Sequence, residues 1–360
     1  MSITVEQVLS ALKNVEDPDL KKDLVTLNMI KDVEIENRFV RFTLELTTPA
    51  CPLKEMLKNA CVNAIKHFVD KEAEIAIHVT SRVTTPVNSN SLDNIKNIIL
   101  VSSGKGGVGK STVASNLAVS LAAEGAKVGL IDADIYGPSV PTMFGLRDAK
   151  PSARETPDGK TRIIPIEKFG VKLLSLGFFA DPDQPVPWRG PMASNAVKQL
   201  FNDADWGELD YLIVDLPPGT GDIHITITQS YPITGAVIVT TPQQVALADT
   251  RKGLAMFLMP GINIPVLGVV ENMAYFTPPE LPDNKYHLFG KDGGKLLAQQ
   301  FNVPFLGELP IVQQVSEAGD SGLPAVLDRT SFVAQAFGAI AGRIAQQVAI
   351  ANATLVTPAV

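Results

Sequence analysis

The sequence predicts an α/β protein with a mostly parallel, doubly wound sheet, preceded by a small α+β domain. Two observations support this prediction. After residue 96, short apolar runs alternate with segments whose apolar residues recur at helical spacing, which is the pattern of parallel strands joined by helices. Residues 1–84 instead follow the order helix, strand, strand, helix, strand. Residues 85–96, which contain a Pro, three Asn and two Ser, are predicted to be a linker, so the larger domain spans 97–360.

Length and composition fit two globular domains. The chain has 360 residues, of which 45% are hydrophobic and 19% charged, enough for a large core. A net charge of −7 without any basic run argues against nucleic acid or an acidic membrane as the main partner. No apolar run reaches the roughly 18 residues of a membrane span, and the N-terminus lacks signal-peptide features. Cys51 and Cys61 imply no disulfide framework, so we expect a cytoplasmic setting.

The small domain is predicted to form an αββαβ unit. Apolar side chains share one face of each predicted helix, and Asp17-Pro18 ends the first helical pattern. Two alternating segments flank a tight turn, as antiparallel strands do. The predicted elements are a helix at 4–15, strands at 30–36 and 39–46, a helix at 53–68 and a strand at 75–79.

The segment Thr47–Pro52, which reads TTPACP, lies between a predicted strand and a predicted helix. It places Cys51 at an exposed helix start, where the helix dipole favours a thiolate with a lowered pKa. Cys51 is therefore a candidate metal ligand or transfer cysteine, although a small apolar packing role is the alternative. Cys61 lies on the apolar stripe of the same helix, and we expect it to be buried.

The larger domain is predicted to alternate strands and helices along its length, which places most strands parallel. Its last helix is expected to be followed by a frayed tail. The predicted strands are 97–102, 127–132, 210–215, 235–240, 264–270 and 304–308, and the predicted helices are 110–124, 191–202, 244–258, 293–301 and 331–351.

Leu100–Thr112 reads LVSSGKGGVGKST and contains a phosphate-binding loop between a predicted strand and a predicted helix. Its glycines let successive N–H groups form an anion nest at the positive end of the helix dipole. Lys110 can reach the β- and γ-phosphates, and Ser111 can bind Mg²⁺. The alternative is a tight turn that binds nothing. The residues predicted to hold ATP are Gly104, Gly106, Gly107, Val108, Gly109, Lys110, Ser111 and Thr112.

Carboxylates follow two later strands, where open α/β sheets gather their ligands. In IDADIYGPS, Asp132 and Asp134 point in alternate directions, so one can support Mg²⁺ while the other, predicted to be Asp134, polarises the attacking water. In YLIVDLPPGTGD, Asp215 ends an apolar strand and is predicted to hold Mg²⁺. The glycine- and proline-rich loop after it is suited to sensing the γ-phosphate.

Asn272 and the histidines are further candidate residues. Asn272 ends a later strand at the same edge and is predicted to contact the adenine, with a turn or capping role as the alternative. The histidines lack the paired spacing of metal ligands, so we expect ordinary surface or core roles. They are His67, His78, His224 and His287.

Lys105, a second lysine after the first glycine, makes the loop resemble the deviant Walker A motif of dimerising ATPases. With DADIYGPS, DLPPGTGD, ENM and SEAGDSGLP, nearly the whole chain resembles Mrp/ApbC-type iron–sulfur cluster carrier ATPases, and TTPACP fits their N-terminal domain. The resemblance implies a Mg²⁺-dependent ATPase that works as a homodimer and delivers clusters to apoproteins with other assembly proteins. Lys105, Lys110 and Asp134 would be catalytic, with Lys105 reaching the partner's nucleotide. On the sequence alone, a solvated loop lysine is the alternative.

One departure from the resembled family concerns cluster binding. The family's Cys-x-x-Cys after ENMxYF is absent here, where Thr277-Pro278-Pro279-Glu280 follows instead. A [4Fe–4S] cluster needs four ligands, usually thiolates. A cluster would therefore be labile and held through Cys51, most simply from two chains, or the protein is an adaptor without a cluster. Oxygen or nitrogen ligands are poor substitutes; the candidates are Glu280, Asp283 and His287.

Two further functions differ from cluster carriage. A nucleotide-switched scaffold like the Min and Par proteins needs a basic terminal helix or surface, whereas the last helix has Arg343 without a cationic cluster. A kinase needs an acceptor pocket that the sequence does not indicate.

Overall fold

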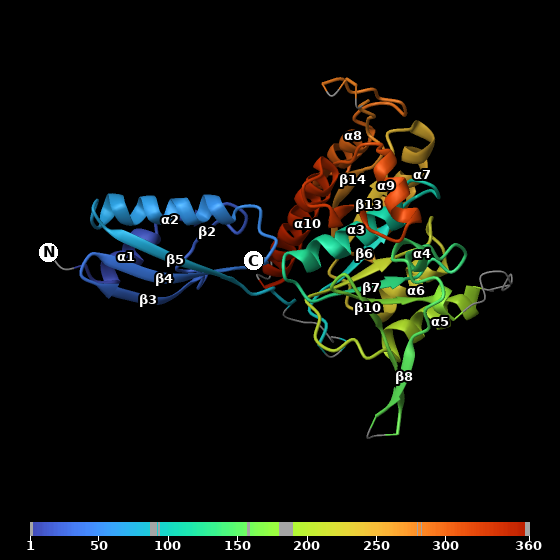
Figure 1. Cartoon of the computed structure of the whole chain (residues 1–360), viewed down its shortest axis with the longest axis horizontal. Coiled ribbons are helices and arrows are strands. Elements are labelled where there is room, and N and C mark those ends of the chain that lie inside the picture. The colour runs from blue at the N-terminus through green and yellow to red at the C-terminus, as the bar shows by residue number, and fades with distance from the viewer. Residues whose placement is uncertain are drawn as a thin grey trace.

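The computed structural model describes residues 3–86, 92, 94–156, 159–179, 190–278, 280–281 and 283–356. A small N-terminal domain lies beside a larger α/β domain, and α10 (Phe332–Val356) runs along the side of the larger domain that faces the small one (Figure 1). None of the helices in these ranges combines the length and apolarity that a bilayer crossing requires.

The small domain has the predicted αββαβ order. Its three-stranded sheet has the order β3-β4-β5, with β3 and β4 antiparallel and β4 and β5 parallel. Two-residue strands β1 (Glu16–Asp17) and β2 (Lys22–Asp23) form a further hairpin, too short to give a sequence pattern. The main elements are α1 (Val5–Leu12), β3 (Ile30–Glu36), β4 (Phe39–Leu46), α2 (Lys54–Phe68) and β5 (Glu74–Ser81).

The larger domain is built on an eight-stranded sheet of order β10-β11-β7-β12-β6-β13-β14-β15, parallel except for the edge strand β10. Its central strands are buried on both faces, which explains their uninterrupted apolar runs. The strands are β6 (Ile98–Ser102), β7 (Val128–Asp132), β10 (Ile166–Lys168), β11 (Val171–Ser175), β12 (Tyr211–Asp215), β13 (Gly235–Thr240), β14 (Val266–Glu271) and β15 (Phe305–Glu308).

Helices cover both faces of this sheet, as the doubly wound prediction requires. One apolar layer joins the sheet to α3 and α10, and the other joins it to α5, α6, α7 and α8. A two-stranded hairpin, β8 (Ser152–Glu155) with β9 (Thr161–Ile164), projects from the domain (Figure 1). The remaining helices are α3 (Lys110–Ala123), α4 (Val140–Met143), α5 (Gly190–Asn202), α6 (Asp222–Ser230), α7 (Gln244–Leu258), α8 (Gly293–Gln300) and α9 (Gln313–Asp320), with short 3-10 turns at Leu176–Phe178 and Ala325–Leu327.

The elements α4, α6, α9, β8 and β9 were not predicted, and three further details differ from the sequence prediction. Strands β10 and β11 were not predicted, because they are short and Lys172 interrupts the apolar pattern of β11. Ile95 is buried and pairs with Leu209, so the larger domain begins inside the predicted linker. Helix α10 continues to Val356, beyond the predicted end. Linker residues 87–91 and 93, Pro279 and the tail 357–360 lie outside the described residues.

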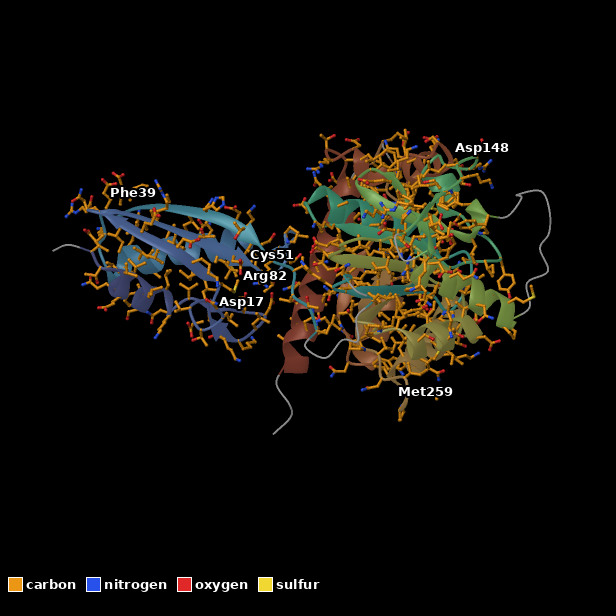
Figure 2. All side chains as sticks on the ribbon, turned by 90° about the horizontal axis from the view of Figure 1, so that it is seen from below. Asp17, Phe39, Cys51, Arg82, Asp148 and Met259 are labelled. Atoms are coloured by element: carbon orange, nitrogen blue, oxygen red, sulfur yellow. The ribbon has the colours of Figure 1, made fainter. Side chains whose placement is uncertain are left out.

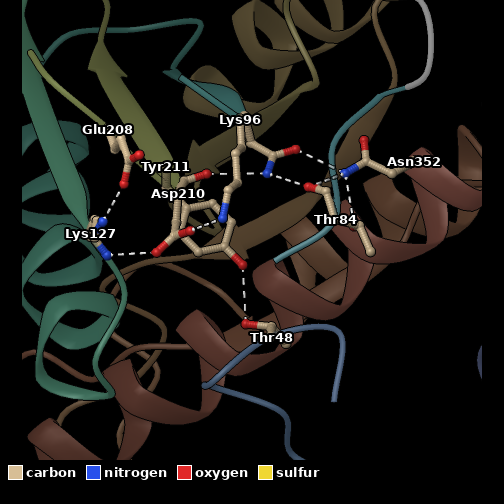
Figure 3. Close-up of polar contacts among 9 residues, drawn as sticks. Thr48, Thr84, Lys96, Lys127, Glu208, Asp210, Tyr211 and Asn352 are labelled. Carbon is tan, nitrogen blue, oxygen red and sulfur yellow. Dashed lines mark hydrogen bonds and ion pairs between the residues drawn. The ribbon is translucent and has the colours of Figure 1, made fainter. Parts of the chain in front are cut away.

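Hydrogen bonds fix the contact between the two domains (Figure 3). The Tyr211 hydroxyl donates to Thr48 Oγ1 at 3.1 Å, and the Asn352 amide donates to the Thr84 carbonyl at 3.1 Å. Gln346 of α10 donates to the carboxylate of Asp19 at 2.7 Å. The contact therefore involves the segment around Thr48, the start of β12 and one face of α10.

Candidate nucleotide-binding site

The phosphate-binding loop connects β6 to α3 and depends on its glycines. A Cβ on Gly104 would lie 2.3 Å from the backbone of Asp249 and Thr250, which is too close to tolerate. Gly107 and Gly109 have φ values of 80° and 81°, a conformation that favours glycine. Gly109 is also the N-cap of α3. The loop thus has the shape that the sequence pattern predicts for an anion nest.

Lys110 lies between two carboxylates at the carboxyl ends of the strands. Its Nζ donates to Asp215 Oδ1 at 2.6 Å and lies 3.8 Å from Asp134 Oδ2, and the residue is only 6% exposed. Nζ also donates to Ser111 Oγ at 3.2 Å. The structure therefore brings together the lysine, hydroxyl and two of the acids that the sequence predicts for phosphoryl chemistry.

The second oxygen of Asp215 fits a metal role. Asp215 is fully buried, and its Oδ2 has no hydrogen-bond partner within the described ranges. A buried carboxylate oxygen without a partner is costly unless a cation or water meets it. This donor suits the hydrated shell of Mg²⁺, which prefers oxygen ligands.

Asp132 and Asp134 have different surroundings. Asp132 is fully buried and accepts hydrogen bonds from the Asp134 and Val140 N–H groups, both at 3.2 Å, and from the Ser175 hydroxyl at 3.0 Å. Burial and repulsion from Asp215 raise the pKa of Asp132 to about 7. Burial also raises the pKa of Asp134, against the opposing effect of Lys110. Asp132 therefore holds the segment after β7 in place, while Asp134 faces Lys110.

Of two further predicted residues, Asn272 contacts the loop from outside and Lys105 is part of it. The side chain of Asn272 donates to the Val108 carbonyl at 2.9 Å and so supports the loop from the end of β14, a contact that the sequence did not indicate. Lys105 is exposed, and its ammonium group has no hydrogen bond or ion pair in the part of the chain that the structure describes. The predicted adenine contact of Asn272 stays a prediction.

The prediction that Cys51 is exposed at a helix start and has a lowered pKa is wrong. Helix α2 begins only at Lys54, so Cys51 lies before its first turn, half-buried against the core of the small domain. Burial, and then the charges of Asp17 and Asp19, raise the pKa of its thiol instead of lowering it. Figure 2 shows Cys51 and Asp17 at the end of the small domain that faces the larger one. Cys61 is fully buried as predicted, and burial raises its pKa to about 12.

The cysteine and the phosphate loop lie at opposite edges of the large sheet. Thr48, three residues before Cys51, bonds to Tyr211 at the start of β12, whereas Asp215 at the end of that strand bonds to Lys110. At about 3.3 Å per residue, the five-residue strand separates these contacts by roughly 13 Å. Cys51 therefore does not belong to the nucleotide site.

The segment after β14 does not assemble a metal site. His287 Nδ1 lies 3.0 Å from the Ala274 carbonyl, and Phe276 pairs with Tyr286. Among the described residues, no three His, Cys, Asp or Glu side chains are grouped to hold a metal ion, Glu280, Asp283 and His287 included.

The larger domain is a P-loop nucleoside triphosphatase. It has a doubly wound sheet, a phosphate-binding loop, and the buried Lys110 bonded to Asp215 at the end of a strand. Residues 94–345 match the family described as NUBPL iron-transfer P-loop NTPase, and residues 5–78 match a family described as iron-sulfur cluster assembly protein. Since the first match covers more than half of the chain, the protein belongs to the NUBPL iron-transfer P-loop NTPase family. The resemblance drawn from the motifs is confirmed.

Relatives of similar length extend this likeness over almost the whole chain. A protein of Synechocystis named iron-sulfur cluster carrier protein is 51% identical over 97% of this chain and 99% of its own length. A protein of the same name in Deinococcus radiodurans is 45% identical over 96% of both chains. A solved nucleotide-binding protein from Archaeoglobus fulgidus, in complex with ADP, is 37% identical, with a TM-score of 0.56 over 67% of this chain and 93% of its own.

Proposed function

We propose that this protein binds and hydrolyses ATP with Mg²⁺ and carries iron–sulfur clusters to recipient apoproteins. The observation that carries the proposal is the 51% identity over 97% of the chain to a protein named as an iron–sulfur cluster carrier. The phosphate loop, with Lys110 bonded to Asp215, supports the ATPase part.

ATP binding would rearrange the contacts of Lys110. The β- and γ-phosphates attract its ammonium more strongly than one carboxylate does, so we expect Lys110 to leave Asp215 for the phosphates. Asp215 and Ser111 would then hold Mg²⁺ and its water, with Asp132 as a further acid nearby. Mg²⁺ supplies positive charge that neutralises the developing phosphate charge. Asp134, released from Lys110, would polarise the attacking water, and slow turnover is expected.

The same proposal includes a homodimer. Lys105 is exposed at the phosphate loop, where its charge is available to a second copy of the chain. Two protomers facing each other through their nucleotide sites would place each Lys105 near the partner's phosphates, where negative charge develops during hydrolysis.

The cluster, as cargo, would be held through Cys51 of each protomer separately. If the protomers meet at their nucleotide edges, the two Cys51 residues lie at the outer edges, so they do not share one cluster as the sequence suggested. Each Cys51 would supply one thiolate, and the remaining ligands would come from a partner's cysteines or a small thiol. We therefore expect weak, oxygen-sensitive loading.

The raised pKa of Cys51 favours a second candidate, an adaptor ATPase that binds assembly proteins without holding a cluster. Anaerobic reconstitution with iron and sulfide, followed by iron counting and visible absorption, separates the two. If the protein is a cluster carrier, we expect substoichiometric loading of the cluster, which Cys51→Ser abolishes and Cys61→Ser leaves largely intact. A stable cluster that survives Cys51→Ser would contradict this ligand, and no loading with intact ATPase activity would favour the adaptor.

A further inference from the structure

His224 is a buried polar residue to which the nucleotide site described above assigns no role. It lies in the first turn of α6, directly after the loop 217–221, and is 0% exposed. Neither ring nitrogen has a hydrogen-bond partner among the residues that the structure describes. Buried polar side chains are nearly always paired, because an unpaired one loses its hydration without replacement. An unpaired imidazole here points to a second arrangement in which it is paired.

The surroundings of His224 connect it to the phosphate site. Burial, and after it the positive charge of Lys110, lower the pKa of His224 to about 4. The ring is therefore neutral at physiological pH, with one N–H donor and one acceptor nitrogen. A neutral ring in this place needs an acceptor for its N–H group and does not supply charge to the phosphates.

The carbonyl of Gly221 is placed to become that acceptor. It already accepts the backbone N–H of His224 at 3.0 Å, which places this oxygen beside the residue that carries the ring. The carbonyl is not aligned with a ring nitrogen as a hydrogen-bond acceptor. A carbonyl oxygen has two lone pairs and accepts a second bond. Because Gly221 ends the loop and caps α6, a small rotation of the loop would align it.

We propose that His224 is a positioning residue whose imidazole N–H pairs with the Gly221 carbonyl when the loop 217–221 closes on the γ-phosphate of ATP. This inference rests on the proposed function, since it requires ATP at Lys110. With ADP the loop stays open and the ring unpaired, so the bond stabilises only the ATP-bound arrangement. His224 thereby raises the preference for ATP over ADP without touching the nucleotide.

Titrations of fluorescent ADP and of a fluorescent non-hydrolysable ATP analogue test the proposal. His224→Leu keeps a similar volume and removes both nitrogens, and it should weaken binding of the ATP analogue about five- to tenfold, the value of one buried hydrogen bond. Its affinity for ADP should stay within about twofold, and its melting temperature without nucleotide should not fall. His224→Asn carries an N–H group near the position of Nδ1, and His224→Gln carries one near the position of Nε2. One of these two variants should therefore restore the preference for the ATP analogue over ADP.

The matched control is His78→Leu, the same exchange at an exposed position of the small domain, which should change neither affinity. An unchanged ratio of the two affinities in His224→Leu would overturn the inference. Equal weakening of both nucleotides, or a lower melting temperature in all three His224 variants, would show a purely structural role and also overturn it. A wild-type protein that binds neither nucleotide would instead overturn the proposed function.

Discussion

Tyr211 and Thr48 join the two domains through a buried hydrogen bond of 3.1 Å between their hydroxyl groups (Figure 3). Tyr211 begins β12 and Asp215 ends it. The first end of this strand therefore contacts the segment that contains Cys51, and the other end contacts Lys110 of the nucleotide site. The small domain is thus attached at a fixed point relative to the ATPase chemistry.

Tyr211→Phe tests the importance of this contact. The ring stays packed while Thr48 loses its donor, so the free energy of unfolding should fall by about 1 kcal/mol. ATP hydrolysis should be nearly unchanged, because the nucleotide lies at the other edge. Chemical denaturation and an ATPase assay measure the two effects. Tyr275→Phe is a control, because the Tyr275 hydroxyl makes no contact to the small domain among the described residues. A large loss of ATP hydrolysis in Tyr211→Phe would contradict the independence of the nucleotide site from the contact between the domains.

Lys110→Ala should abolish productive ATP binding, because the backbone nest alone does not neutralise a triphosphate, and it also leaves Asp215 without its buried cation. Asp134→Asn should retain binding and lose turnover, by on the order of 100-fold in kcat. Nucleotide titration and steady-state phosphate release measure both effects. Full hydrolysis in either variant would remove the assigned role.

Lys105→Ala should leave a folded monomer that has lost ATPase activity and ATP-dependent association. The reason is that the lysine is exposed and would act only on the partner's phosphates. Sedimentation with a non-hydrolysable ATP analogue measures association. Lys252→Ala removes another exposed lysine and serves as control. A fully active Lys105→Ala protein would mean that Lys105 is an ordinary loop lysine.

The thiol of Cys51 should react slowly for a half-exposed cysteine. Since its pKa is raised, the thiolate fraction is small at pH 7 and grows about tenfold per pH unit, without a plateau below pH 9. Asp19→Asn removes one of the negative charges that raise this pKa and should speed alkylation at pH 8, whereas Asp32→Asn, at an exposed position, should not. A plateau below pH 8 would show a lowered pKa after all.

The sequence predicted those structural elements that depend on the pattern of neighbouring residues. The strands β3, β4 and β13 and the loop before Lys110 follow from residues close together in the chain. The state of Cys51 depends on Asp17 and Asp19, which only the folded domain brings near it. In the same way, Asn272 meets Val108 across 164 positions, a contact that helical or strand periodicity does not encode. The unpaired state of His224 likewise follows from packing alone.

The most direct test of the central claim is cluster transfer to an apoprotein. The protein is loaded anaerobically with iron and sulfide, separated from free iron, and mixed with an inactive apo-enzyme that needs a [4Fe–4S] cluster. We predict that wild-type protein restores the enzyme's activity, and that Cys51→Ser restores none while Cys61→Ser still does. Restoration by Cys51→Ser at the wild-type level, or none by wild-type protein that hydrolyses ATP normally, would contradict the carrier account.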